Sequence, residues 1–171
     1  RRRHTRFRNV TGVQTCALPI CHVNVTPPVT VGLDSRLLII PAGTTAVEQR
    51  LVVQATSFSP APIDGVLRLK LPSGWTATPA QAPFSLKAAG EQTSTPFVVR
   101  APAARTRGSF NVVAEAVVGG EAYSRDVQVI AYPHIQTHRI YSNATANAEV
   151  FDLKVAPVRV GYVMGAGDEV P

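Results

Sequence analysis

Apolar and polar residues alternate with a period of two through most of the chain between Val23 and Ile130. In Leu67-Arg-Leu-Lys-Leu71 the three leucines would face a core while the two basic residues face water, because successive strand side chains point to opposite faces. No stretch of this region has a convincing helical period, so the sequence predicts strands separated by turns. The other sets expected to face a core are Leu51 with Val53 and Ala55, Phe110 with Val112, Ala114 and Ala116, and Val127 with Val129.

Glycine and proline interrupt these runs at short intervals, as they do in turns. Gly119-Gly120 is the sharpest signal and predicts a two-residue hairpin between Phe110–Val118 and Glu121–Ile130. Seven to nine short strands result, which favours an all-β, immunoglobulin-like antiparallel two-sheet sandwich. The expected strands are Val23–Val31, Leu37–Ile40, Glu48–Thr56, Gly65–Leu71, Thr76–Thr78, Pro83–Leu86, Thr93–Arg100, Phe110–Val118 and Tyr123–Ile130.

The first 21 residues differ in character from the rest. Val10–Ile20 resembles the conceptual translation of a common DNA-sequencing adapter, so we expect residues 1–21 to be adapter-derived or read-through and disordered. Without their five arginines, Lys plus Arg falls from 17 to 12 against 11 Asp plus Glu, and the net charge falls from +6 to +1. Both cysteines, Cys16 and Cys21, lie in this segment, so they do not indicate an oxidising compartment.

The alternative interpretation of this segment is a basic arm for nucleic acid or an anionic membrane. Basic runs are weak motifs, and we expect neither partner. No apolar run approaches the ~20 residues of a membrane-spanning helix. The arginines concerned are Arg1, Arg2, Arg3, Arg6 and Arg8.

Two histidines are the candidates for a metal site. His134 and His138 are four residues apart, a spacing that on a helix would place both imidazoles on one face, where they could bind zinc. Pro133 and the lack of a third ligand argue against a helix and a zinc site, so we expect no metal there. Gly165-x-Gly167 resembles part of a phosphate-binding loop but lacks its remaining residues.

The sequence offers no catalytic group. A nucleophilic Ser or Cys needs a His that is oriented by a third group, and no such set is evident in the sandwich region. Glu115, Glu121 and Asp126 are expected on the solvent side of one hairpin.

The single tryptophan, Trp75, follows a glycine turn and is interpreted as a core residue, with ligand contact as the alternative. Asn24-Val-Thr26 and Asn143-Ala-Thr145 fit the glycosylation pattern.

Three turn motifs carry a family resemblance. The segments Leu69–Pro79, Phe84–Glu91 and Phe97–Pro102 resemble the alpha-galactosidase-associated sandwich domain of the NEW type, over roughly Leu51 to Ile130. This chain has Ala-Ala-Gly-Glu91 where Pro-Gly-Glu is more usual in the family. The resemblance implies the sandwich fold and a domain that accompanies glycan-active or hydrolytic domains, with glycan as a possible partner.

The later part of the chain resembles another family. Pro133–His138 and Val158–Pro171 are similar to the C-terminal half of large secreted bacterial PIG-L-type (LmbE-like) de-N-acetylases. This resemblance implies a secreted or periplasmic parent with a zinc-dependent deacetylase domain outside this chain, so no cofactor is expected here. The family's His-Pro-Asp-Asp signature is absent, and no catalytic residue can be assigned. The expected organisation is a β-sandwich over 22–132, a connector over 133–157 that includes a strand at Phe151–Val155, and the first strand and turn of a truncated, amidotransferase-like α/β domain over 158–171.

Overall fold

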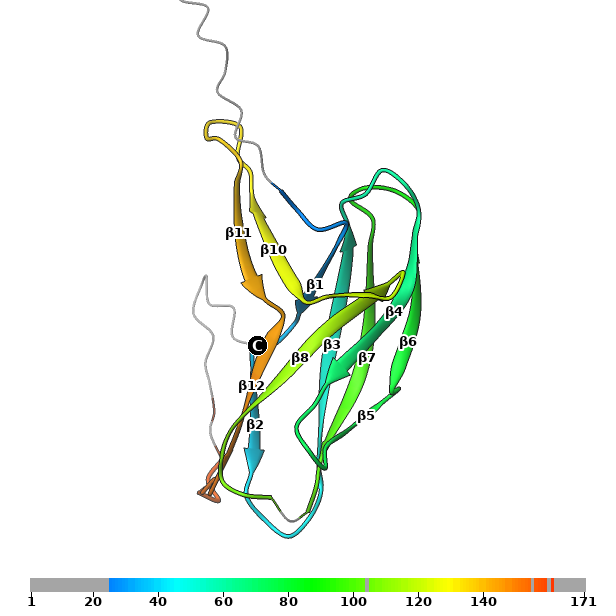
Figure 1. Cartoon of the computed structure of the whole chain (residues 1–171). Helices are drawn as coiled ribbons and strands as arrows, with labels where there is room; N and C mark the ends of the chain where they lie inside the picture. Colours follow the sequence, from blue (N-terminus) through cyan, green and yellow to red (C-terminus); the bar gives the residue numbers. More distant parts are fainter. Residues whose placement is uncertain (1–24, 104, 155, 160, 162–171) are drawn as a thin grey trace, which may run out of the picture.

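The computed structural model describes residues 25–103, 105–154, 156–159 and 161. These residues form two packed β-sheets and a separate two-stranded ribbon, and they contain no helix (Figure 1). The prediction of an all-β sandwich is therefore confirmed. No helix that could cross a membrane occurs in the described part of the chain.

The smaller sheet has four strands in the order β1-β3-β7-β5. They are β1 (Val29–Leu33), β3 (Val47–Ser57), β7 (Gln92–Ala101) and β5 (Thr76–Thr78), and all pairs are antiparallel. Of the expected strand Val23–Val31, the described residues 25–28 are in no strand, and β1 begins at Val29, after two prolines that lack the N–H group of a ladder.

The larger sheet follows the order β2-β12-β8-β4-β6, with β9 also paired to β8. The pairing of β12 with β2 is parallel and the other pairs are antiparallel. The chain changes sheets between β1 and β2, so this early segment contributes one edge strand to each sheet (Figure 1). The strands are β2 (Leu37–Pro41), β4 (Ile63–Lys70), β6 (Gln81–Leu86), β8 (Gly108–Val118), β9 (Glu121–Tyr123) and β12 (Thr145–Phe151).

The core lies between the two sheets and consists of the alternating positions expected from the sequence. Leu51 and Phe97 of the smaller sheet are fully buried, as is Leu67 of the larger one. Strands β8 and β12 contribute mainly small side chains to the same core. Bulky residues of both sheets thus share the core with the small residues of β8 and β12, which fits the close packing of protein interiors. The small residues are Ala114, Ala116, Ala146 and Ala148.

The turn motifs have structural roles. Gly74 and Gly90 have φ of 81° and 84°, a left-handed conformation that favours glycine. Next to Gly74, the Trp75 amide donates to the Pro72 carbonyl at 3.2 Å. After Gly90, the Glu91 carboxylate accepts from the Ala88 amide at 3.2 Å and also from the Lys87 amide.

The predicted hairpin at Gly119-Gly120 is confirmed, with φ of 58° and 91° at the two glycines. Its second strand, however, is shorter than predicted. Only β9 pairs with β8; after Ser124 the chain turns away, and β10 (Arg125–Ile130) pairs with β11 (His138–Asn143) instead. The prediction that Val127 and Val129 share a buried face is wrong for Val129, which is 45% exposed because β10 has left the sheet.

The segment predicted to be a connector, 133–157, also needs correction. It contains β11 and β12, and β12 lies inside the larger sheet between β2 and β8. The strand expected at Phe151–Val155 is the end of β12, which stops at Phe151, since residues 152–154 are in no strand. The sandwich therefore continues past Tyr132, and its last strand buries Ala146, Ala148 and Val150.

Several predictions lie outside the described residues. These are the segment 1–21 that was expected to be adapter-derived, including Cys16 and Cys21, together with Asn24 and the Gly165-x-Gly167 loop. Of the expected α/β segment 158–171, only residues 158, 159 and 161 are described, and none of them is in a strand.

Candidate functional site

The most distinctive feature of the fold is the ribbon, residues Arg125–Asn143, formed by β10, β11 and their connecting turn. It extends from the end of the sandwich beside β1 and belongs to neither sheet (Figure 1). Its side chains include several large apolar groups that are more than 40% exposed. These are Val129, Tyr132, Ile135 and Ile140.

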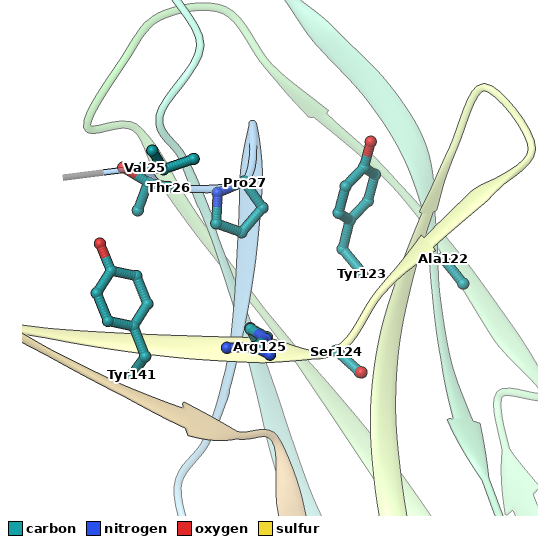
Figure 2. A pocket seen from close by; sticks show the side chains of 8 residues that line it. All are labelled: Val25, Thr26, Pro27, Ala122, Tyr123, Ser124, Arg125 and Tyr141. Carbon is teal, nitrogen blue, oxygen red and sulfur yellow. The ribbon is translucent and has the colours of Figure 1, made fainter.

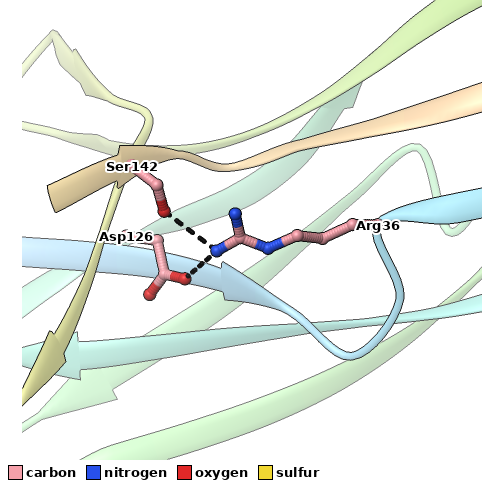
Figure 3. Close-up of polar contacts among 3 residues, drawn as sticks. All are labelled: Arg36, Asp126 and Ser142. Carbon is pink, nitrogen blue, oxygen red and sulfur yellow. Dashed lines mark hydrogen bonds and ion pairs between the residues drawn. The ribbon is translucent and has the colours of Figure 1, made fainter. Parts of the chain in front are cut away.

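A polar cluster fastens the root of the ribbon to the sandwich (Figure 3). The Arg36 guanidinium, in the turn between β1 and β2, donates to the Asp126 carboxylate at 3.0 Å and to the Ser142 hydroxyl at 2.9 Å. Asp126 is on β10 and Ser142 on β11, so one arginine holds both strands. A side chain on Gly32 would place its Cβ 3.3 Å from Asp126 Oδ1, so the glycine leaves room for this carboxylate.

Arg36→Ala is expected to loosen the ribbon while leaving the sandwich stable. Arg36 is 60% exposed, and exposed ion pairs contribute about 0.2–1 kcal/mol. Amide hydrogen exchange in β10 and β11 should become roughly two- to fivefold faster, with an almost unchanged unfolding midpoint. Arg100→Ala, which removes an equally exposed partner of Glu48, is the control and should leave exchange in the ribbon unchanged. Equal exchange in both variants would show that the Arg36 cluster does not hold the ribbon.

A pocket of about 460 Å³ lies where the chain turns from β9 into β10. One wall comes from Tyr123, Ser124 and Arg125, and another from Tyr141 on β11. The segment before β1 completes it with Thr26 and Pro27. Figure 2 shows the two tyrosine rings on opposite sides of Pro27. The remaining lining residues are Val25 and Ala122.

Two polar side-chain atoms of β11, one of them on the lining residue Tyr141, are buried without a hydrogen-bond partner. They are Tyr141 Oη and Arg139 Nε, and no other side-chain nitrogen or oxygen of the described residues shares this state. Both belong to β11, two residues apart, and therefore to one face of the ribbon. A buried polar group that lacks a partner costs about 1–3 kcal/mol, so its presence needs an explanation.

A second hollow, of about 500 Å³, lies at the opposite end of the sandwich. Its only charged lining residue is Arg105. The Arg105 guanidinium already donates to the carbonyls of Pro41, Thr45 and Pro102. These bonds join the β2–β3 and β7–β8 loops, so Arg105 stabilises the fold and has few donors left for a ligand.

The residues singled out in the sequence do not gather in either hollow. Trp75 is 8% exposed and packs on Phe110 with ring centroids 5.9 Å apart, in agreement with its interpretation as a core residue. His134 lies in the turn of the ribbon beside Tyr132, and His138 begins β11. Because His134 lies in a turn and His138 at the start of a strand, this segment lacks the helical geometry that would place both imidazoles on one face. The described residues contain no group of three or more potential metal ligands.

Two of the three carboxylates singled out in the sequence form ion pairs, and the third is exposed. Glu115 pairs with Arg68 of the neighbouring strand at 2.8 Å, and Asp126 belongs to the Arg36 cluster. Glu121 is exposed next to the hairpin turn, and Asn143 is exposed at the end of β11.

Sequence reasoning did not identify the pocket, because its walls come from three separate segments. Tyr123 and Tyr141 are 18 positions apart in the sequence and come together only because the ribbon folds back at Ser124 and Ala144. The Ala144 amide donates to the Ser124 carbonyl at 2.9 Å and closes the base of the ribbon. Neither segment carries a motif that would have signalled this contact.

Comparison with known proteins gives distant structural similarities. A member of the MSP family from C. elegans, WR4, is 8% identical with a TM-score of 0.41, over 71% of this chain and 97% of its own. The PapD-like domain 7 of human CEP192 is 14% identical with a TM-score of 0.40, over 79% and 97%. A family 123 glycoside hydrolase from Clostridium perfringens is 11% identical with a TM-score of 0.40, over 74% of this chain but 28% of its own. No curated protein matches the chain.

A family model gives a more specific match. It begins at the end of β2, ends within the β8–β9 turn and contains the motifs around Trp75 and Glu91. The resemblance inferred from those turn motifs is thereby confirmed, although the matched segment leaves out the ribbon and β12. Residues 41–119 of this chain match the NPCBM-associated, NEW3 domain of alpha-galactosidase.

Proposed function

We propose that this chain is a non-catalytic accessory module of a larger, secreted, glycan-active hydrolase. The match of residues 41–119 to the NEW3 domain carries this proposal, since that domain is an accessory β-domain associated with glycosidases. The roles of the matched residues support it, because Gly74, Gly90 and Glu91 form turns and Trp75 fills the core. In this role the sandwich keeps neighbouring domains of the parent protein at a fixed separation.

We further propose that the parent is a PIG-L-type, zinc-dependent de-N-acetylase. The supporting observation is the resemblance of Pro133–His138 and Val158–Pro171 to that family. The zinc ion and the catalytic residues would belong to a domain outside this chain. The α/β domain expected to begin at residue 158 would follow the sandwich directly, since β12 ends at Phe151.

Recovery of the complete gene tests both statements. Genomic sequence upstream of the codon for residue 22 is expected to encode a hydrolase domain that carries a His-Pro-Asp-Asp segment. A hydrolase domain of another type would contradict the deacetylase parentage and retain the accessory function. A gene that encodes no hydrolase domain would contradict the accessory function itself.

The alternative function is a carbohydrate-binding module. Its first candidate platform, Trp75, has an exposed fraction of 8% and offers little ring surface against which a sugar could stack. A Trp75→Ala variant should therefore lose core packing rather than a ligand contact. Carbohydrate binding by this chain would need another site.

A further inference from the structure

We propose that the pocket beside the root of the ribbon binds a saccharide that carries a negatively charged group, such as a uronic acid. This goes beyond the accessory function, because a spacer needs no ligand. The proposal rests on three features of the pocket: its size, its aromatic walls, and a set of hydrogen-bond donors that the described protein atoms leave unused.

The size and position of the pocket suit a small ligand. Its volume of about 460 Å³ falls within the roughly 300–1,000 Å³ of small-molecule sites. It is an open cleft at one end of the sandwich, between the segment before β1 and the ribbon (Figure 2). A chain end of a larger glycan could therefore enter it from solvent.

Two aromatic rings line the cleft. Tyr123 and Tyr141 lie on opposite sides of Pro27, and all three line the pocket (Figure 2). The C–H face of a pyranose packs against such rings, while their hydroxyl groups can bond to the hydroxyls of a sugar. Ser124 and Thr26 add two further hydroxyl groups to the lining.

One side chain of the lining and one of its neighbours on β11 carry a polar atom that is not bonded to the described protein atoms. Tyr141 Oη is buried without a partner, although Tyr141 lines the pocket. Arg139 Nε is in the same state two residues along β11. Because buried polar atoms in proteins are nearly always paired, an acceptor-rich ligand would remove an existing penalty on binding.

Arg125 is the charged residue of the pocket lining, and its positive charge favours an anionic ligand. Arg125 is directly paired with Asn143 and Arg139 with Val129, positions that share one face of the ribbon with Tyr141. Neither arginine forms an ion pair within the described part of the chain, whereas Arg36 on the other side is neutralised by Asp126. Residues 1–24, which lead into Val25, contain no Asp or Glu that could supply a carboxylate.

These features define how the ligand would lie. The sugar ring would lie over Pro27, between the rings of Tyr123 and Tyr141, with its carboxylate toward Arg125. Tyr141 Oη, which is buried in the free chain, would donate to the same carboxylate or to the neighbouring ring hydroxyl once the side chain shifts toward the cleft. Guanidinium–carboxylate bonds are charge-assisted and stronger than neutral ones, so the acidic group should dominate affinity.

Isothermal titration calorimetry of the 171-residue chain with digalacturonate tests the proposal. The acidic disaccharide should bind at least about tenfold more tightly than the neutral galactose disaccharide, in line with one charged hydrogen bond. Arg125→Gln should weaken binding roughly tenfold or more, and Tyr141→Phe roughly fivefold. Tyr141→Phe should keep or slightly raise the unfolding midpoint, since it removes a hydroxyl that lacks a partner.

Matched controls separate the site from general effects of charge. Arg50→Gln makes the same change at an exposed position of β3, and Tyr132→Phe does so in the turn of the ribbon; both should bind like the unmodified chain. No heat of binding from the folded chain would overturn the proposal, as would equal affinity for the neutral disaccharide. Unchanged binding by Arg125→Gln and Tyr141→Phe would overturn the site. If inorganic phosphate binds as tightly as digalacturonate, the claim that the ligand is a saccharide is wrong, and the pocket is a simple anion site. The accessory function is tested separately, by recovery of the complete gene, and none of these binding results contradicts it.

Discussion

A chain that ends at Tyr132 is expected to remain unfolded, whereas a chain that ends at Lys154 should unfold cooperatively like the full-length chain. Tyr132 is the end of the sandwich predicted from the sequence, but the structure places β12 after it. Without β12, the edge strand β2 loses the one strand with which it pairs among the described residues. Strand β8 would then expose to water the edge that β12 covers over Gly108–Val113.

The energetic consequence is comparable with the stability of a whole domain. Removal of β12 uncovers one side of the core, where Ala146 and Ala148 are fully buried and Val150 is 2% exposed. It also removes the ladders to two strands, and each net hydrogen bond contributes about 0.5–1.5 kcal/mol. Domains are stable by only about 5–15 kcal/mol, so this loss leaves no folded state.

Circular dichroism and thermal unfolding of the two truncated chains, 1–132 and 1–154, provide the measurement. The longer chain should show β-sheet signal and an unfolding midpoint within a few degrees of the full chain. The shorter chain should show no cooperative transition. A cooperative transition of the 1–132 chain at a similar temperature would mean that β12 is an accessory strand rather than part of the fold.

Strong alternation of large apolar residues made most of the sandwich predictable. Leu51, Val53 and Ala55 on β3 and Leu67 on β4 are all fully buried, as their period-two pattern predicts. The glycine turns were predictable because glycine readily adopts positive φ, and Gly119-Gly120 does form a tight hairpin. Local chemistry is sufficient at these positions.

Strand β12 escaped prediction because its buried face is made of alanine. Ala144, Ala146, Ala148 and Val150 do alternate with more exposed residues, which is the same signal as on β3. Alanine has a small apolar side chain and is depleted in strands, so an alternation of alanine with polar residues does not by itself predict a buried strand. The burial predicted for Val129 was wrong for a different reason. Val129 does belong to an alternating strand, but that strand, β10, pairs with β11 outside both sheets.

The pocket depends on long-range contacts that no local pattern encodes. It exists because β10 leaves the sheet at Ser124 and β11 returns the chain at Ala144. The same departure places Arg125 and Tyr141 on one face and leaves Tyr141 Oη without a partner. The sequence predicted the scaffold, whereas the candidate site arises where the scaffold deviates from the regular alternation.

Gly65→Ala is expected to destabilise the sandwich strongly, although it adds a single methyl group. Gly65 lies on β4 between β6 and β8, and a Cβ there would stand 2.5 Å from the Val117 carbonyl oxygen. It would also stand 2.9 Å from the Phe84 ring. A side chain can turn away, but the Val117 carbonyl belongs to the backbone of an interior strand, so the two strands must separate.

The expected cost lies at the upper end of the roughly 1–3 kcal/mol of overpacked cores. For a domain of this size it corresponds to a fall in the thermal midpoint of roughly 6–12 °C. Gly43→Ala is the matched control, since nothing lies within 4 Å of the added Cβ, and its midpoint should barely change. Adding Phe84→Leu to Gly65→Ala removes the ring contact but not the carbonyl contact, so it should restore little of the loss. A full recovery in the double variant would assign the strain to Phe84, and equal midpoints for Gly65→Ala and Gly43→Ala would show that β4 and β8 can separate at little cost.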